Sequence, residues 1–276
     1  MSLSDRNEEV LSLDAIGESY GELRLVNPRA EKQMLESLER YGQMSPVVVC
    51  RQATDGYELL DGFKRLRASR RLGTQSGLRA RVLEVGARAA KAAVLFLNWV
   101  SRSVSDLEEG WVVHALCRED GLTQVEVGEL LGRHRSWVSR RLSLVERLSD
   151  EVQSQLRLGL ITGTVGRELA RVPRGTQERF LEAITEHGLG SREVAGLVDL
   201  VREASVEEQA RILRSPREAL VAEGKSPAEV RDPRLAEAGN QLLQELSRME
   251  RSCARVVSSV GVQGLSHLRR GDWLVL

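Results

Sequence analysis

Hydrophobic side chains in the first hundred residues fall into short runs of strand length. These runs are rich in β-branched residues, and the dipeptide Asp55-Gly56 between the first two is typical of a hairpin turn. A shorter apolar alternation at residues 10–16 lies in a mixed stretch, residues 1–25, which we expect to be peripheral. The pattern predicts three strands, at residues 46–50, 57–60 and 78–85.

Helical spacing of apolar residues dominates the rest of the chain. Gly42 and Gly73 each follow such a stripe, at the position where glycine commonly ends a helix. In the first part of the chain, the predicted helices lie at residues 31–41, 63–72, 87–100 and 107–117. No good strand pattern follows residue 119 until the C-terminus, and further helices are predicted at residues 124–131, 136–147, 150–158, 176–187, 191–203 and 206–213.

The last sixty or so residues combine a linker-like stretch with one long helical pattern. Residues 214–234 contain three prolines, which favours short helix fragments and a linker. Residues 235–260 then place apolar side chains at spacings of four and three, the pattern of a coiled-coil seam. This helix either pairs with a second copy or folds back on the body of the protein, and residues 269–276 fit either a small strand or a basic tail. The seam consists of Leu235, Gly239, Leu242, Leu246, Met249, Cys253, Val256 and Val260.

Together these elements predict an α+β chain that is mostly α-helical. We expect a small α/β domain at residues 1–100 and an all-α domain at residues 101–204. A linker at residues 205–234 and a C-terminal amphipathic helix at residues 235–276, available for dimerisation, complete the predicted organisation.

Composition narrows the classes of function. With 41% hydrophobic and 29% charged residues the chain is of the soluble globular type, and its uncharged runs are too short for a membrane helix. The N-terminus lacks the apolar segment of a signal peptide. The cysteines and histidines are scattered, which excludes a disulfide framework and a spaced metal site and fits a reducing cytoplasm. The net charge is zero, but residues 62–91 and 133–147 are strongly basic, which suits either solvated helix faces or an anionic partner.

Residues 121–142 have the features of a helix-turn-helix. Thr123 followed by Glu126 forms a capping box, and Gly132 stands where the turn between two helices needs a positive φ. Gly128 is small where the two helices come close, and Ser136 is placed to cap the second helix. The alternative is an ordinary helical hairpin with a charged outer face. The spacing favours DNA binding, with the second helix in the major groove.

The outer face of this second helix carries residue types that read and hold DNA. Arginine makes bidentate contacts to guanine, while hydroxyl groups suit phosphates. Arg140 and Arg141 are both expected to be exposed, whereas Trp137 either contacts DNA or packs against the preceding helix. The predicted DNA-binding residues are Thr123, Gln124, Arg133, Arg135, Ser136, Trp137, Ser139, Arg140 and Arg141.

The order of the motifs resembles the ParB partition-protein family over roughly residues 10–200. Asn27-Pro28-Arg29 with Gly42 and Pro46-Val-Val-Val resembles the first N-terminal box of the family. Residues 57–68 resemble its second box, which usually reads Gly-Glu-Arg-Arg-x-Arg-Ala, and residues 98–109 resemble its third. The helix-turn-helix follows at the expected distance. The helical domain that comes next in the family is matched by Ile161-Thr162, Arg167 and residues 191–194.

This resemblance implies an N-terminal domain that binds CTP with Mg²⁺ and a homodimeric clamp that closes on DNA. Gly62 allows a close approach of the backbone, and the helix N-terminus that follows favours phosphate. The cations after it, including Arg70, can neutralise a triphosphate. The implied nucleotide-binding residues are Arg29, Gly62, Lys64, Arg65, Arg67 and Asn98, and Asn98 is also the implied metal ligand.

Three positions depart from the family pattern. Phe63 replaces the glutamate of the second box, and Leu97 replaces the glutamate that begins the third. The arginine of the third box falls on Ser101, with Arg102 one residue later. A leucine can neither orient a water molecule nor accept its proton, so CTP hydrolysis is expected to be weak or absent. Nucleotide binding without hydrolysis, and its complete loss in a retained scaffold whose arginines touch DNA phosphates, both remain open.

We therefore expect a sequence-specific DNA-binding protein of the partition type, located on the nucleoid in the cytoplasm. Its expected partners are double-stranded DNA, a second copy of the chain and a partition ATPase, with no membrane. A transcriptional or mobile-element regulator without a nucleotide switch is one alternative. Another is an enzyme, because relatives of this N-terminal domain include nucleases, small-molecule kinases and sulfiredoxins. The predicted pocket offers Asp61, Asn98 and cations, but neither a cysteine nor paired carboxylates.

Overall fold

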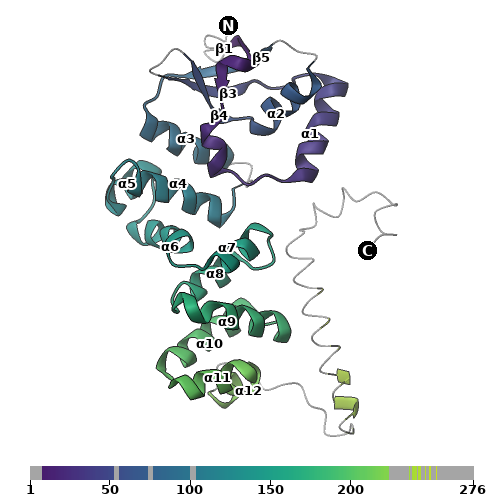
Figure 1. Cartoon of the computed structure of the whole chain (residues 1–276), viewed down its shortest axis with the longest axis vertical. Coiled ribbons are helices and arrows are strands. Elements are labelled where there is room, and N and C mark those ends of the chain that lie inside the picture. Colours follow the sequence, from purple (N-terminus) through teal and green to yellow (C-terminus); the bar gives the residue numbers. More distant parts are fainter. Residues whose placement is uncertain are drawn as a thin grey trace. The chain divides into compact units, whose positions relative to one another are not determined.

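The computed structural model describes residues 8–52, 56–73, 77–99 and 104–223, together with residues 236, 238–240, 242, 243, 246, 249 and 253. The chain divides into two compact units, Met1–Arg174 and Gly175–Leu276 (Figure 1). In its described part, the first unit contains a sheet and the α-helices α1 to α8, and the second unit contains the helices that follow. The fold is α+β with helices predominating, which confirms the predicted class.

The first unit begins with a five-stranded sheet in the order β1-β5-β3-β4-β2. β3 lies between β4, to which it runs antiparallel, and β5, to which it runs parallel. The three predicted strands are confirmed, but the prediction of a peripheral N-terminus is wrong. Residues 8–17 supply both edge strands, and Leu11 and Ile16 are buried because they pack into the core below the sheet. The strands are β1 (Glu8–Ser12), β2 (Ile16–Gly17), β3 (Val47–Arg51), β4 (Tyr57–Asp61) and β5 (Gly77–Leu83).

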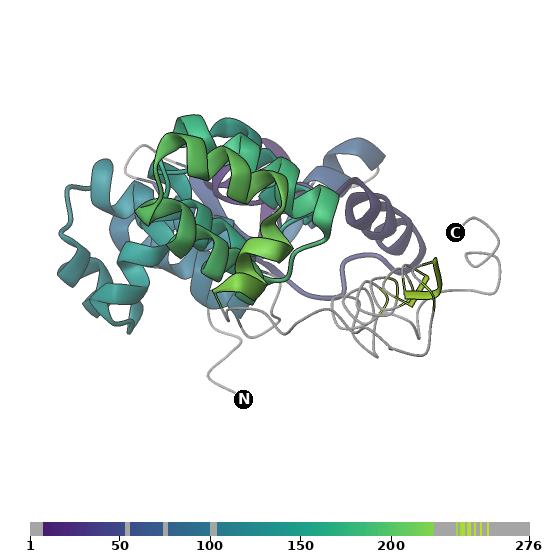
Figure 2. The ribbon, with the colours of Figure 1, turned by 90° about the horizontal axis from the view of Figure 1, so that it is seen from below.

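Strand alternation buries both faces of this sheet. Val47 and Val49 face one core, which includes Leu66 of α2 (Phe63–Leu72). Val48 and Cys50 face the other, against α3 (Ala87–Trp99). α1 (Pro28–Tyr41) lies beside α2 and ends at Gly42, whose φ of 65° confirms the predicted stop. Figures 1 and 2 both place α1 and α5 on opposite flanks of this unit.

The remainder of the first unit is helical. α3 contributes Ala92 and Leu95 to a core that α4, α5 and α6 complete with Val112, Val127 and Val138. Helix α8 was not predicted, because two of its seven residues are glycines and its apolar pattern is short; Thr162 caps it, and buried Gly166 packs against Leu156. The helices are α4 (Asp106–Arg118), α5 (Gln124–Leu131), α6 (Arg135–Glu146), α7 (Asp150–Arg157) and α8 (Gly163–Leu169).

The second unit is described as helices, starting within α9. Its core includes Phe180, Leu197, Val198 and Leu220. The predicted linker at residues 214–234 begins with a helix, α12, and residues 224–235 lie outside the described part. The helices are α9 (Arg174–His187), α10 (Ser191–Glu203), α11 (Val206–Arg214) and α12 (Pro216–Ala222).

The predicted C-terminal helix is described only at isolated positions, which are helical where they are described between residues 238 and 253. Leu242, Leu246 and Met249 of the predicted seam are exposed. Leu235, Val256, Val260 and the stretch at residues 269–276 lie outside the described residues. Among the helices that are described, none has the length and apolarity to cross a membrane.

Candidate nucleic-acid interface

Helices α5 and α6 form a helix-turn-helix whose turn matches the sequence prediction. The Thr123 hydroxyl accepts a hydrogen bond from the Glu126 amide at 3.3 Å, and the Glu126 carboxylate accepts one from the Thr123 amide at 2.8 Å. The hydrogen bonds that the Thr123 amide and hydroxyl donate to the Glu126 carboxylate hold the pKa of Glu126 below its usual value. Gly132 has a φ of 62°, and a Cβ on Gly128 would lie 2.6 Å from the Arg133 carbonyl oxygen. The predicted capping box, turn and close approach are therefore confirmed.

The start of α6 differs from the prediction, in which Ser136 was the cap. The cap is His134, whose Nδ1 accepts a hydrogen bond from the Ser136 amide at 3.1 Å, so α6 begins one residue earlier, at Arg135. The reason is local: an imidazole nitrogen at the N-cap can satisfy a free amide of the first turn as a hydroxyl would. Ser136 is therefore in the first turn of α6, where its side chain is exposed.

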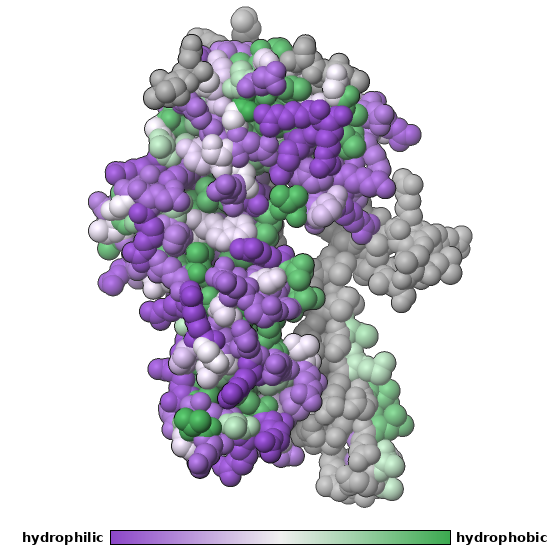
Figure 3. Space-filling model, in the orientation of Figure 1, coloured by the Kyte–Doolittle hydropathy of each residue, from purple (hydrophilic) through white to green (hydrophobic). Residues whose placement is uncertain are grey.

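The first half of α6 presents an exposed polar face. Arg135 and Arg140 have no ion-pair partner among the described residues, so their guanidinium groups are available to an external anion. The surface over α5 and α6 is largely hydrophilic in Figure 3. Gln124 is half-buried at the start of α5. The other predicted DNA-binding residues that are exposed are Thr123, Arg133, Ser136 and Ser139.

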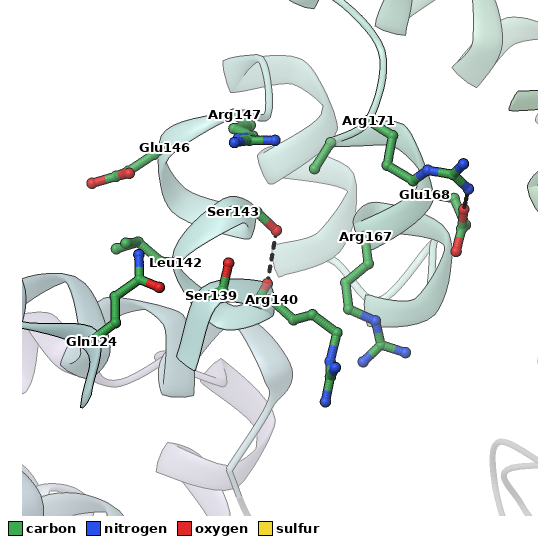
Figure 4. Close-up of a pocket in the computed structure, with 11 residues that line it drawn as sticks. Gln124, Ser139, Arg140, Leu142, Ser143, Glu146, Arg147, Arg167, Glu168 and Arg171 are labelled. Carbon is green, nitrogen blue, oxygen red and sulfur yellow. Dashed lines mark hydrogen bonds and ion pairs between the residues drawn. The ribbon is translucent and has the colours of Figure 1, made fainter. Parts of the chain in front are cut away.

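A groove of about 280 Å³ separates α6 from α8 and gathers arginines from both helices (Figure 4). Arg140 of α6 and Arg167 of α8 extend out of it in the same direction. Arg171, in the turn after α8, pairs with Glu168 of that helix, and Arg167 lies 3.6 Å from Asp106. Arg167 and Arg171 are not among the DNA-binding residues predicted from the sequence. The available signal was Thr162 as a helix cap, followed by arginines four residues apart on one helical face.

Arg141 is not on this outer face, and the prediction that it is exposed is wrong. Its side chain is 8% exposed and is bound by the carboxylates of Glu109 and Asp106 in α4. The cause is the crossing of α4 and α6. A Cβ on Gly110 would come within 2.9 Å of the Arg141 carbonyl oxygen, so this turn of α6 lies directly against the acidic first turns of α4.

Trp137 packs inside the first unit. Its ring is half-buried and meets Trp99 of α3 edge to face, with 6.3 Å between ring centroids. The Arg133 guanidinium lies over both rings, 4.6 Å from the Trp99 centroid and 5.5 Å from the Trp137 centroid. The sequence left two roles open for Trp137, DNA contact and packing against the preceding helix. The structure shows packing, and the ring contacts α3 as well as the core shared with α5.

A second concave region, a cleft of about 660 Å³, lies at the amino end of α2. Gly62 precedes this helix with a φ of 103°, and a Cβ there would lie 2.6 Å from a Val47 methyl group. No side chain caps the helix, so its first amides face the cleft region without a side-chain acceptor. This arrangement fits an anionic group such as a phosphate.

Most of the cations that are predicted to bind the nucleotide form ion pairs with carboxylates of the protein. Arg65 donates to Asp61 at 2.8 Å and to backbone carbonyls before β3, and Arg67 pairs with Glu18 and Glu31. Lys64 is exposed and has no ion-pair partner among the described residues. Arg70 also pairs with Glu18, and Arg29 lies on the exposed face of α1, outside the residues that line the cleft.

Asn98 and two carboxylates complete the cleft. The Asn98 amide donates to the Val94 carbonyl at 2.9 Å. Asp61 and Glu108 both line the cleft, and each of them forms an ion pair with an arginine, Asp61 with Arg65 and Glu108 with Arg24. Glu108 is 3% exposed and accepts hydrogen bonds from the Leu25 and Ser105 amides. The described residues contain no cluster of three His, Cys, Asp or Glu side chains able to hold a metal ion.

Two family models match this chain: the ParB N-terminal domain over residues 2–99 and the ParB HTH domain over residues 102–203. The chain belongs to the ParB-like family. A probable chromosome-partitioning protein ParB from Pseudomonas putida is 30% identical over 179 residues, which cover 65% of this chain and 61% of the relative. The chromosome-partitioning protein Spo0J from Thermus thermophilus is 34% identical over 166 residues, 60% of each chain. The ParB-like chain thus matches about three fifths of the length of these curated relatives.

Solved structures with a similar chain include two of truncated ParB from Caulobacter crescentus. One is complexed to the centromeric parS site, with a TM-score of 0.46 and 23% identity over 71% of this chain and 100% of that one. The other is complexed with CTP-gamma-S, with a TM-score of 0.32 and 22% identity over 62% of this chain and 97% of that one.

Two of the positions that are expected to depart from the family pattern, Phe63 and Leu97, lie in apolar surroundings, while Ser101 lies outside the described residues. Phe63 is 6% exposed and belongs to the core between the sheet and α2. Leu97 packs against the core between α3 and the other face of the sheet. Neither environment would accommodate a carboxylate without a desolvation cost. The replacements are thus integrated into the packing.

Proposed function

We propose that this ParB-like chain is a sequence-specific DNA-binding protein that acts in partition of a chromosome or plasmid on the nucleoid, together with a partition ATPase. The observation that carries the proposal is the exposed face of α6, where Arg135 and Arg140 have no ion-pair partner in the described part of the chain and flank the hydroxyls of Ser136 and Ser139. A second helix of a helix-turn-helix with such residues at its amino end reads bases in the major groove.

The groove between α6 and α8 supports this assignment, because it adds positive charge beside the same face. Arg167 of α8 and Arg171 in the turn after it line the groove with Arg140 and Arg147, against two carboxylates. Positive side chains on a neighbouring helix hold DNA phosphates and fix the register of the reading helix, but they carry no sequence information themselves. We assign base reading to α6 and phosphate contact to α8.

The test begins with selection of bound duplexes from a random pool by the full chain. Affinity for the selected duplex and for a scrambled duplex of equal length is then measured by fluorescence anisotropy over a range of salt concentrations. Arg140→Ala should weaken binding and, if the lost contact is to a phosphate, lower the slope of log K against log salt by about 0.9.

Arg71→Ala is the matched control, because it removes one exposed cation from the last turn of α2, away from α6. It should leave both the affinity and the slope unchanged. Failure of the wild-type chain to enrich any duplex, or equal loss of binding in the two variants, would contradict the assignment of α6.

We further propose that the cleft at α2 binds CTP with little or no hydrolysis. Among the described residues, no side chain caps the amino end of α2 behind Gly62, and Lys64 has no ion-pair partner. Both can therefore hold phosphate oxygens, and Asn98 lies in the same cleft. Bound CTP with Mg²⁺ would supply a switchable contact for closing a dimer. The apolar packing of Phe63 and Leu97 leaves no carboxylate at the positions where the family has glutamates, which supports loss of hydrolysis.

Calorimetric titration with CTP and Mg²⁺, together with a phosphate-release assay, tests this cleft. Heat that saturates for CTP, that is reduced in Lys64→Ala and that comes with no phosphate release is the expected result. No heat at millimolar nucleotide would remove the nucleotide from the proposal and favour a regulator that uses the scaffold without a switch. DNA selection would be unaffected by that outcome.

Dimerisation through the C-terminal helix is the third part of the proposal. Leu242, Leu246, Met249 and Cys253 follow one another at spacings of four, three and four, and their side chains are exposed. Such a stripe buries itself by pairing with the same stripe of a second copy. Analytical ultracentrifugation of Leu246→Glu should show a monomer where the wild-type chain sediments as a dimer. An unchanged oligomeric state in this variant, and in a chain truncated at Arg234, would refute the seam.

A further inference from the structure

Arg141 occupies an unusual position for an arginine on a reading helix, because it faces the protein. Its Nε donates to Glu109 and its Nη2 donates to Asp106 at 2.8 Å, so both carboxylates come from α4. Its Nη1 is buried and has no hydrogen-bond partner among the described residues, and the guanidinium lies 5.3 Å from the centroid of the Trp137 ring. The guanidinium is thus enclosed within the first unit by two carboxylates and an aromatic ring.

The same two carboxylates also hold other elements. The second oxygen of Glu109 accepts a hydrogen bond from the Trp99 indole of α3 at 2.9 Å. The second oxygen of Asp106 pairs with Arg167 of α8, and a Cβ on Gly163 at the start of α8 would lie only 2.0 Å from it. Asp106 and Glu109 therefore connect α6 to α3 on one side and to α8 on the other.

We propose that Arg141 is a positioning residue for DNA reading, and that its pairing with Asp106 and Glu109 fixes the rotation of α6 and its separation from α8. The inference rests on the proposed DNA binding. The planar guanidinium accepts few orientations when it binds two carboxylates at once, so it fixes the helix that carries it more tightly than an apolar contact would. With α6 fixed in this way, Ser139 and Arg140 face outward together, and Arg167 of α8 is held beside them.

Direct DNA contact by Arg141 does not fit this geometry. A phosphate or base would have to displace two carboxylates from a side chain that is 8% exposed. The stability gained from a buried ion pair is small, because desolvation offsets much of the attraction. The arrangement is better suited to specifying one orientation of α6 than to stabilising the fold.

Glu109→Gln separates positioning from simple electrostatics. The glutamine keeps an oxygen for the Trp99 indole but removes the charge that holds Arg141. Loss of a negative charge near the interface would by itself raise affinity for any DNA. Positioning predicts instead that the ratio of affinities for selected and scrambled duplexes falls on the order of tenfold, as when one well-placed base contact is lost. The matched control is Glu129→Gln, which removes an exposed charge from α5 and should leave the ratio unchanged.

A double variant, Arg141→Met with Glu109→Gln, keeps the result interpretable if a single variant folds poorly. It removes the charges of both residues, so neither is left in the interior without the other. This double variant should have wild-type circular dichroism, the same loss in the affinity ratio and the wild-type salt dependence for scrambled DNA. An unchanged ratio would overturn the proposal, as would a salt slope lower by about 0.9, which would mean that Arg141 contacts a phosphate. If the wild-type chain selects no duplex at all, the proposed function fails first, and the two failures are distinguishable.

Discussion

Gly128→Ala gives a sharp test of how the helix-turn-helix is held. The amide of Arg133 donates to the Gly128 carbonyl at 2.8 Å, so the turn into α6 is attached to this turn of α5. A Cβ on residue 128 would lie 2.6 Å from the Arg133 carbonyl oxygen, and the turn must move by about 0.8 Å to restore an ordinary 3.4 Å contact. The atom it meets is backbone, so no side-chain rotation can relieve the clash.

The expected change combines two opposing effects. Alanine in a helix is favoured over glycine by about 1 kcal/mol, whereas overpacking a close contact costs about 1–3 kcal/mol. We expect Gly128→Ala to lower the free energy of unfolding of the first unit by about 1 kcal/mol. Because α6 follows the displaced turn, affinity for a selected duplex should fall on the order of tenfold.

Urea unfolding followed by tryptophan fluorescence measures the first effect, since three of the four tryptophans, Trp99, Trp111 and Trp137, lie in the first unit. Gly175→Ala is the control: this glycine is in α9, and a Cβ there meets no atom within 4 Å. The control should be neutral or slightly stabilising and should bind DNA normally. If Gly128→Ala behaves like Gly175→Ala in both assays, the close approach between α5 and the turn does not control the position of α6.

Three further predictions concern the rest of the molecule. Leu66→Ala, at a position that is fully buried beneath the sheet, should lower the free energy of unfolding by about 2–5 kcal/mol in urea titration, and a smaller loss would mean that the core collapses into the cavity. Hydrogen bonds from Thr123 lower the pKa of Glu126, so the wild-type chain should be more stable than a Glu126→Gln variant above the ordinary glutamate pKa of 4.5. This difference in the free energy of unfolding should disappear as the pH falls through the lowered pKa, and a difference that does not depend on pH would contradict the reasoning. Burial raises the pKa of the Cys50 thiol, so Cys50 should resist iodoacetamide in the native protein while exposed Cys253 reacts, and equal labelling by mass spectrometry would refute the difference.

Local signals account for what was predictable at the interface. Thr123, Glu126 and Gly132 act on the backbone within four residues of themselves, so a capping box and a positive φ can be read from sequence alone. The central strands were predictable for a similar reason, because strands buried on both faces form continuous apolar runs. The two edge strands near the N-terminus were missed, since their short alternation gives a weak signal without the sheet beside them.

The exposure of individual side chains on α6 was not predictable in the same way. In the sequence, Arg141 lies three residues after Val138 and four before Val145, so helical periodicity places it on the same stripe as these apolar side chains, whereas Arg140 lies off that stripe. Charged residues are mostly exposed, and that general rule led to the prediction that both arginines are exposed. The structure buries Arg141 because α4 crosses α6 at Gly110 and brings Glu109 and Asp106 against it. That crossing depends on contacts between residues some thirty positions apart.

By itself, the sequence determined the mostly helical α+β class, the position of the helix-turn-helix and the family, because caps, glycine turns and apolar periodicity act over short stretches of chain. Tertiary structure decided which cations remain available. Arg67 and Arg141 are each neutralised by carboxylates from distant segments of the chain, while Lys64 and Arg140 have no ion-pair partner among the described residues. The physical reason is that the availability of a cation for an outside partner depends on the opposite charges nearest to it in space. Charges from distant segments come together only in the folded chain.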